Sequence, residues 1–356
     1  MIVAALLLAQ AAPAGAWAVA DGRARVAAAD ISLPTAAGGL TLVETGEASQ
    51  KGSGVDDVAE YRSADGAVRG TAFVFRPAYA DTALASWQLG RVMAQRYGAA
   101  TRLGEMRAMA VDGHADALLR ARYDGAVAAG QPIATTSGFV RASSWLIGLR
   151  VTAPAARQAE VATAFDALAA GLRFGAGLHV YAAAPLVVTG ACPPAAEHDA
   201  APMASGREAG AQLLGAAMAG GSLLVDLPPK PGKPPTTIGP AFPRNGLDQV
   251  CVRGTVTGVP LLQPAGEAEP AIVLGVLDDA GGTIAWERAL IGSGYLVSSY
   301  GIAAKRVRGG WTGLPSLDQM TRLMTGADAA GAKIRASVTT KPGGGTDISV
   351  DPGVFR

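Results

Sequence analysis

A proline-rich segment limits how this chain can be organised. Residues 228–243 read PPKPGKPPTTIGPAFP. Because proline lacks the N–H group that a helix or a strand ladder needs, this segment predicts an extended surface loop or linker. The chain has 356 residues, which is more than one hydrophobic core usually accommodates. We therefore expect two domains, residues 30–175 and residues 244–356, joined by a transition and linker over residues 176–243.

The first expected domain mixes segments rich in β-formers with two amphipathic segments. A helix is expected after Asp81 and up to Tyr97, because Gly98 occupies the position favoured just after a helix end. A second helix is expected after Pro154, with apolar residues at helical spacing up to Leu172. Strands are expected at residues 40–43, 58–62, 70–75, 106–111, 115–123 and 139–151. This order predicts an α+β domain in which helices cover an antiparallel sheet.

The same order of elements resembles the Mog1/PsbP-like α/β/α sandwich. The residues that carry the resemblance are Ile31–Pro34, Gly70–Arg76, and Trp145–Val151 together with the helix that leads to Phe174. The resemblance implies a twisted antiparallel sheet covered by an early helix and a C-terminal helix. Proteins that look like this are mostly small binding or assembly-assisting modules, so the resemblance implies no catalytic residue.

The second expected domain is mostly β by pattern. Strands are expected at residues 250–257, 271–277, 283–291, 295–300, 333–339 and 346–350. Residues 278–282 read DDAGG, which indicates a hairpin turn. A helix is expected over Ser316–Met324, since its apolar residues share one side and Gly326 follows. The whole chain is therefore expected to be α+β, with two small domains, each an antiparallel sheet covered by one or two helices.

The N-terminus predicts export. Residues 1–20 read MIVAALLLAQAAPAGAWAVA and contain no charged side chain. The apolar run Ile2–Leu8 is too short to span a bilayer, and small residues follow at spacings that signal peptidase recognises. We expect a signal peptide over residues 1–20, cleaved after Ala18 or Ala20, and a periplasmic or secreted protein. The alanine- and glycine-rich composition is typical of a GC-rich bacterial gene.

Two alternatives to a cleaved leader stay open. The segment before the apolar run has no Lys or Arg, which a signal peptide normally has. This missing charge has two explanations. Either the true start codon lies upstream and the leader is longer, or the segment stays uncleaved as an anchor. A buried N-terminal helix is the other alternative.

The only two cysteines are Cys192 and Cys251. In an oxidising compartment an even pair predicts a disulfide, here closing a loop of about 60 residues. Two buried free thiols are the alternative, because sequence spacing does not show that the two Cα atoms approach each other. Neither cysteine belongs to a C-x-x-C pair, which disfavours a metal site.

Charge and hydropathy narrow the class of partner. Lys and Arg number 30 and Asp and Glu 29, so no net field attracts nucleic acid or an anionic membrane. Beyond the leader, no uncharged apolar stretch is long enough to span a bilayer. We expect a globular chain with no nucleic-acid partner, no membrane span in the mature chain, and an unidentified protein or envelope partner.

Motifs for catalysis, cofactors and metals are absent from the sequence. There is no H-E-x-x-H, G-x-S-x-G, P-loop or G-x-G-x-x-G, and no two histidines have helical ligand spacing. We therefore expect no catalytic residue, no cofactor and no metal ligand. The cluster Glu197–Asp199 near Cys192 could form a metal or acid–base site, but a solvated loop is the favoured interpretation.

Two charged motifs have alternative interpretations. Asp56–Asp57 and Asp278–Asp279 are adjacent acids, which point to opposite faces of an extended chain and so make no shared-proton pair. The basic run Lys305–Arg308, followed by Trp311, could bind an anionic glycan, a lipid head group or nucleic acid. A solvated strand end is the favoured interpretation, because the whole chain is nearly neutral.

Two function hypotheses follow. The first is a non-enzymatic exported protein that acts as a binding or interaction module. The second is an exported hydrolase whose residues meet only in the fold, and its polar candidates are His114, His198, Asp199 and Ser293–Ser299. The hydrolase hypothesis requires a histidine within hydrogen-bond reach of a serine or carboxylate in a cleft. We favour the binding module.

Overall fold

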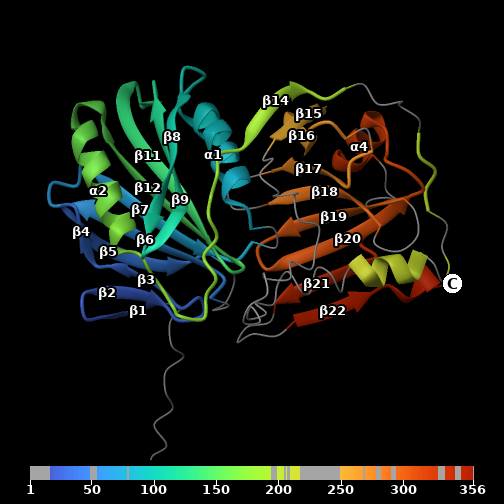
Figure 1. The fold of residues 1–356 in the computed structure, drawn as a ribbon, viewed down its shortest axis with the longest axis horizontal. Helices are drawn as coiled ribbons and strands as arrows, with labels where there is room; N and C mark the ends of the chain where they lie inside the picture. The colour runs from blue at the N-terminus through green and yellow to red at the C-terminus, as the bar shows by residue number, and fades with distance from the viewer. Residues whose placement is uncertain are drawn as a thin grey trace, which may run out of the picture.

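A computed structural model describes the chain in ranges separated by gaps. The described residues are 17–48, 54–77, 80–193, 199–203, 206, 209–216, 249–267, 269–277, 282–289, 294–327, 333–340 and 346–355. The proline-rich segment and most of the expected leader lie outside them. Two large sheets stand on either side of helix α1 (Thr82–Tyr97) (Figure 1).

The first large sheet, here called the N-terminal sheet, has nine strands and is antiparallel throughout. Its strands are β4 (Ala36–Ala37), β5 (Leu40–Glu47), β6 (Asp56–Ser63), β7 (Arg69–Phe75), β8 (Arg102–Val111), β9 (His114–Asp124), β10 (Val127–Ala128), β11 (Gln131–Ala142) and β12 (Trp145–Pro154). Their order in space is β4-β5-β6-β7-β12-β11-β9-β8, with β10 paired to β11. Strands β7, β12 and β11 therefore lie at the centre of the sheet, and their side chains form the middle of each of its two faces.

A small four-stranded sheet accompanies the N-terminal sheet. Its strands are β1 (Trp17–Ala20), β2 (Arg23–Val26), β3 (Ile31–Pro34) and β13 (Arg173–Phe174), in that spatial order. The Trp17 indole donates to the carbonyl of Gly46 in β5, at 3.0 Å. We call the small sheet and the N-terminal sheet together the N-terminal unit, and this name includes β1 and β2, which precede residue 30.

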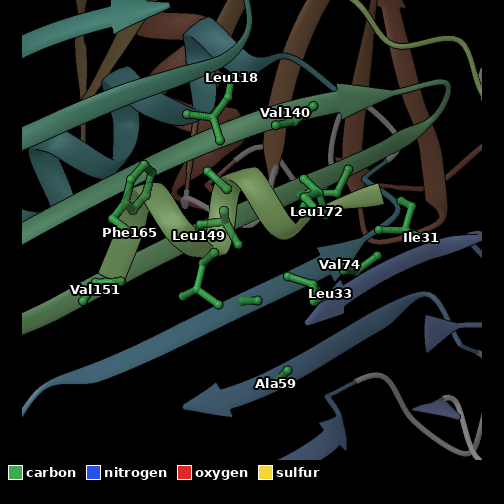
Figure 2. Close-up of a cluster of buried hydrophobic side chains, with 14 of the residues drawn as sticks. Ile31, Leu33, Ala59, Val74, Leu118, Val140, Leu149, Val151, Phe165 and Leu172 are labelled. Carbon is green, nitrogen blue, oxygen red and sulfur yellow. The ribbon is translucent and has the colours of Figure 1, made fainter. Parts of the chain in front are cut away.

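Helix α2 (Gln158–Gly171), which follows the short 3-10 turn η1 (Ala155–Arg157), covers one face of the N-terminal sheet. Its apolar stripe includes Phe165 and Leu168, both fully buried. They pack with alternate residues of the central strands, such as Leu149 and Val151 of β12 (Figure 2). Each such side chain contributes about 1.5–3 kcal/mol on burial, so this cluster forms the principal core of the N-terminal unit.

Helix α1 covers the opposite face of the same sheet. Asp81 begins the helix by accepting hydrogen bonds from the N–H groups of Ala83 and Leu84, and Gly98 follows its last residue at φ +96°. Both signals agree with the expected bounds. Three residues of α1 face the N-terminal sheet: Ala85, Leu89 and Met93. They are buried against aromatic and aliphatic residues of β7, β9, β11 and β12.

The second large sheet, here called the C-terminal sheet, also has nine strands. They are β14 (Val187–Ala191), β15 (Gln249–Val256), β16 (Val259–Pro264), β17 (Ile272–Val276), β18 (Thr283–Arg288), β19 (Tyr295–Gly301), β20 (Ala304–Trp311), β21 (Ala336–Thr340) and β22 (Thr346–Val350). They lie in chain order, and every neighbouring pair is antiparallel except β14 with β15. The parallel pair departs from the purely antiparallel sheet expected from the sequence.

Short helices accompany the C-terminal sheet. Residues 209–216 are helical, α4 (Leu317–Met324) begins at a capping box formed by Ser316 and Gln319, and η2 (Pro352–Phe355) ends the described chain. Met320 and Leu323 of α4 bury against one face of the sheet, around Trp286. The chain is therefore α+β, as expected, with sheet predominating.

The two large sheets are joined through α1 and one hairpin turn. Leu84 and Trp87 of α1 pack into the core of the C-terminal sheet. Arg91 donates to the carbonyl of Gly258 at 2.7 Å. From the other side, Ile302, between β19 and β20, packs against the core that α1 forms with the N-terminal sheet. Helix α1 therefore belongs to two cores at once.

One strand expected from the sequence is wrong. Residues 139–151 form parts of two strands, because β11 ends at Ala142 and β12 begins at Trp145. The chain reverses at Ser143, whose φ is +51° and whose N–H donates to the carbonyl of His179. The apolar pattern continues through this turn without the Gly or Pro that usually marks one.

Candidate functional site

The predicted disulfide is present. Cys192 and Cys251 are joined by an S–S bond of 2.03 Å, and their Cα atoms are 4.9 Å apart. The bond fastens the residue that follows β14 to the adjacent strand β15, across a sequence separation of 59. The bond therefore ties the end of β14 to β15 within the C-terminal sheet.

Among the described residues, the polar candidates for a hydrolase do not form a common site. The ring of His114 is exposed and packs edge-on against Phe174, with ring centroids 6.0 Å apart. Asp199 instead accepts a hydrogen bond from Ser316 at 2.7 Å. His198 and Ser293 lie outside the described residues.

The remaining serine candidates belong to β19. Ser298 is buried and donates to the Glu287 carboxylate at 3.0 Å, and Ser299 accepts from Arg308 at 3.1 Å. Within the described ranges, no group of three or more His, Cys, Asp or Glu residues is placed to hold a metal ion.

The basic run at 305–308 does not form a solvated strand end throughout, and this interpretation is corrected. Lys305 lies in β20, is 1% exposed, and its Nζ is 2.9 Å from Oε2 of Glu287. Tyr300 also donates to that carboxylate, and the ammonium lies 4.8 Å from the centre of the Tyr300 ring. The alternation of β20 points Lys305 into the core, where a charge persists only with such partners.

A cavity of about 220 Å³ lies at the edge of α1, on its face of the N-terminal sheet. We call it the α1 pocket. Its lining comes from β6, β7, β11, β12 and α1, and consists of Asp56, Phe73, Phe75, Leu89, Arg96, Phe139, Gly148, Leu149 and Arg150.

The floor of the α1 pocket is made by strand register. Gly148 of β12 stands directly between Phe73 of β7 and Phe139 of β11. A methyl group on Gly148 would lie 2.9 Å from a ring carbon of Phe139. The absent side chain therefore lets the Phe139 ring lie over the β12 backbone and leaves a hollow with an aromatic floor.

The α1 pocket contains two arginines and one aspartate, and in the described part of the chain the two arginines form no ion pair. Arg150 lies over the Phe73 ring, 5.9 Å from its centre, and Arg96 lies over the Tyr97 ring at 5.5 Å. Neither guanidinium has an ion-pair partner among the residues that the structure describes. Burial, and then the nearby Glu47 carboxylate, raise the pKa of Asp56. The pocket thus presents two cations and one carboxyl group that resists ionisation.

A second cavity, of about 270 Å³, lies beside β10. Its lining includes Arg122 and Asp124, and these two are paired through hydrogen bonds of 3.0 and 3.1 Å. Thr135 of this lining is also bonded, to Thr152 at 2.9 Å. Because its charges are already satisfied within the protein, this cavity offers a charged ligand less than the α1 pocket does.

Sequence reasoning missed the α1 pocket, although one signal was present. In β12 the apolar residues Ile147, Leu149 and Val151 alternate with Gly148 and Arg150. The side chains of the three apolar residues face α2, whereas Gly148 and Arg150 face the pocket. A glycine and an arginine on the second face of a central strand mark a place where that face is neither fully packed nor fully solvated.

Comparison with solved structures gives a likeness. No protein-family model and no curated protein matches the chain. Among solved structures, the chain is similar to the solution structure of cyanobacterial PsbP (CyanoP) from Synechocystis sp. PCC 6803. The sequences are 13% identical, the TM-score is 0.32, and the match covers 46% of this chain and 95% of the other. This weak likeness agrees with the PsbP-like resemblance noted from the sequence, and at that TM-score it says nothing about ligands.

None of the helices in the described parts of the chain is long and apolar enough to cross a lipid bilayer.

Proposed function

We propose that this protein is an exported, non-enzymatic binding module, and that the α1 pocket is its ligand site. The observation that carries the proposal is the pocket itself, where two uncompensated arginines border an aromatic floor. Binding sites are typically concave and apolar, with a few polar groups that fix orientation. The α1 pocket has this composition, and its volume of about 220 Å³ is below the roughly 300–1,000 Å³ of most ligand pockets, so it suits a small ligand.

Filling the pocket floor tests the proposal. In Gly148→Ala the new methyl group pushes the Phe139 ring toward the cavity, because 2.9 Å is too short for a carbon contact. We expect the wild type to bind the neutral ring compound 2-phenylethanol, with amide shifts in NMR spectra at Phe73, Phe139 and Gly148. Gly148→Ala should lose about tenfold or more of that affinity.

The matched control is Gly309→Ala in β20, where an added methyl group meets nothing within 4 Å. It should bind as the wild type does. If 2-phenylethanol shifts resonances only elsewhere, or if both alanine variants bind equally well, the α1 pocket is not the ligand site. Thermal unfolding of both variants shows whether Gly148→Ala is folded before its affinity is compared.

We further propose that the exported chain begins at Trp17. Trp17–Ala20 pairs residue by residue with β2, and the Trp17 side chain packs on the N-terminal core. Cleavage after Ala18 or Ala20 would remove half or all of this strand. The residues Ala14-Gly15-Ala16 also fit the small-x-small pattern, and cleavage after Ala16 leaves β1 complete.

The mass of the exported protein tests this junction. When the full-length chain is produced in a bacterium, the periplasmic or secreted fraction should have the mass and N-terminal sequence of a chain that starts Trp-Ala-Val-Ala. A start at Val19 or Asp21 would contradict the junction. Retention of the whole protein in the cytoplasm would contradict export.

The division into two domains also belongs to this proposal. Residues 178–183 still pair with the N-terminal unit, through the bridge between Ala142 and Val180 and the hydrogen bond from Ala183 N–H to the Asp116 carbonyl, whereas β14 begins at Val187 in the C-terminal sheet. These contacts support a boundary between Ala183 and Val187. Each unit then has one large sheet, and α1 fills the space between them.

A further inference from the structure

We infer that the ligand of the α1 pocket is a small carboxylate with an aromatic or similarly flat apolar body. This inference rests on the proposed function and names the ligand class of the same site. It follows from three properties of the pocket, which are its charge, its floor and its size.

The charge selects an anion. Arg150 lies at the sheet end of the pocket and Arg96 on α1 above it, and each lacks an ion-pair partner in the described structure. A guanidinium presents its N–H groups in a planar fork that matches a carboxylate. Burial also raises the pKa of Asp56, so this carboxyl group opposes an anionic ligand less than a fully solvated aspartate would.

The floor and the volume select the rest of the molecule. Phe73, Phe75 and Phe139 present ring surface, on which a flat apolar group packs well. An apolar cavity of about 150 Å³ holds one benzene molecule. The volume of 220 Å³ therefore accommodates one ring and leaves roughly 70 Å³ for a short link and a carboxylate. Larger anions, such as nucleotides, exceed this space.

Three ring compounds of nearly equal size separate the possibilities. Phenylacetate, 2-phenylethanol and 2-phenylethylamine carry a negative, a neutral and a positive group on the same body. Titration calorimetry with the full exported chain should show phenylacetate binding at least about tenfold more tightly than the alcohol, with the amine weakest. Acetate, which lacks the ring, should bind at least about tenfold more weakly than phenylacetate.

Arginine variants locate the carboxylate. Arg150→Gln and Arg96→Gln should each weaken phenylacetate binding by about tenfold, the usual effect of losing one charge-assisted hydrogen bond. The loss for 2-phenylethanol should be smaller than the loss for phenylacetate, because the alcohol carries no charge for the guanidinium to pair with. Arg102→Gln, at an exposed arginine of β8 outside the pocket, should bind phenylacetate as the wild type does. Arg150→Lys keeps the charge and should recover part of the affinity.

The outcomes distinguish the inference from the proposal beneath it. If the alcohol or the amine binds as tightly as phenylacetate, or if Arg150→Gln and Arg96→Gln leave phenylacetate affinity unchanged, the ligand class is wrong and the site stands. If none of the three ring compounds binds, the α1 pocket is not a ligand site and both statements fail.

Discussion

Asp57 is a carboxyl group enclosed in the N-terminal core. Its side chain is fully buried, and neither oxygen has a hydrogen-bond partner. Burial, followed by the charges of Glu47 and Asp56, raises its pKa to about 7. A carboxyl group with a raised pKa favours folding while it is protonated. This contribution is complete below its unfolded pKa, near 4, and is lost as the pH rises through 7.

Replacing Asp57 with asparagine should therefore change the pH dependence of stability. We expect Asp57→Asn to be more stable than the wild type at pH 8, by at most about 4 kcal/mol, and similar to it only near pH 4 and below, with the difference growing between pH 4 and 7. Urea unfolding across this pH range measures the difference. Asp21→Asn, in the turn between β1 and β2, is the control and should leave the wild-type profile unchanged. Equal profiles for Asp57→Asn and the wild type would show that Asp57 is ionised in the folded state without penalty.

The buried pair of Glu287 and Lys305 behaves differently, because each charge has a partner. Lys305→Met leaves Glu287 buried without its cation and should lower the free energy of unfolding by about 3–5 kcal/mol. The double variant Lys305→Met with Glu287→Leu should recover much of this loss, as an apolar pair often replaces a buried ion pair well. Chemical denaturation measures all three proteins. A double variant that is less stable than Lys305→Met would show that Ser298 and Tyr300 depend on the Glu287 carboxylate.

At the scale of elements, the disulfide holds the start of the C-terminal sheet. The two cysteines are separated by 59 positions in the sequence. The chain-entropy relation predicts that closing such a loop raises the free energy of unfolding by about 4 kcal/mol. We expect the double variant Cys192→Ala with Cys251→Ala to lose up to this amount of unfolding free energy. Denaturation of the wild type with and without a reductant provides an independent measurement. No change in either comparison would mean that β14 and β15 stay paired without the bond.

Local signals predicted some elements well and others poorly. The start and end of α1 were predictable because Asp81 and Gly98 act through their immediate neighbours. The turn at Ser143 was missed, since a serine with a positive φ gives no sequence signal and its N–H bonds to His179, distant in sequence. Glu287, the partner of Lys305, lies in β18, two strands away in the sheet. Because the local sequence does not show this partner, residues 305–308 were interpreted as a solvated basic run. The α1 pocket likewise depends on register among β7, β11 and β12, which no single segment specifies.

At the scale of the whole molecule, the shared helix predicts cooperative unfolding. Ile302 packs against the α1 core of the N-terminal unit, while Arg91 and Gln88 donate to carbonyls of the C-terminal sheet, at 2.7 and 3.4 Å. We expect one calorimetric transition for the wild type. The double variant Ile302→Asp with Arg91→Ala should show two transitions, because it introduces an unpaired charge at the junction and removes a hydrogen bond across it. Two transitions already in the wild type would show that the junction contributes little.

Helix α1 also has a consequence for how the chain is made. Its residues 82–89 are mostly buried, and Leu84 and Trp87 pack in the core of the C-terminal sheet, most of whose strands begin at residue 249 or later. A ribosome needs roughly 10 to 40 s to add the intervening residues and those strands. During that time the N-terminal unit presents an apolar surface to its surroundings. Chaperones that bind nascent chains should therefore stay bound longest at this helix.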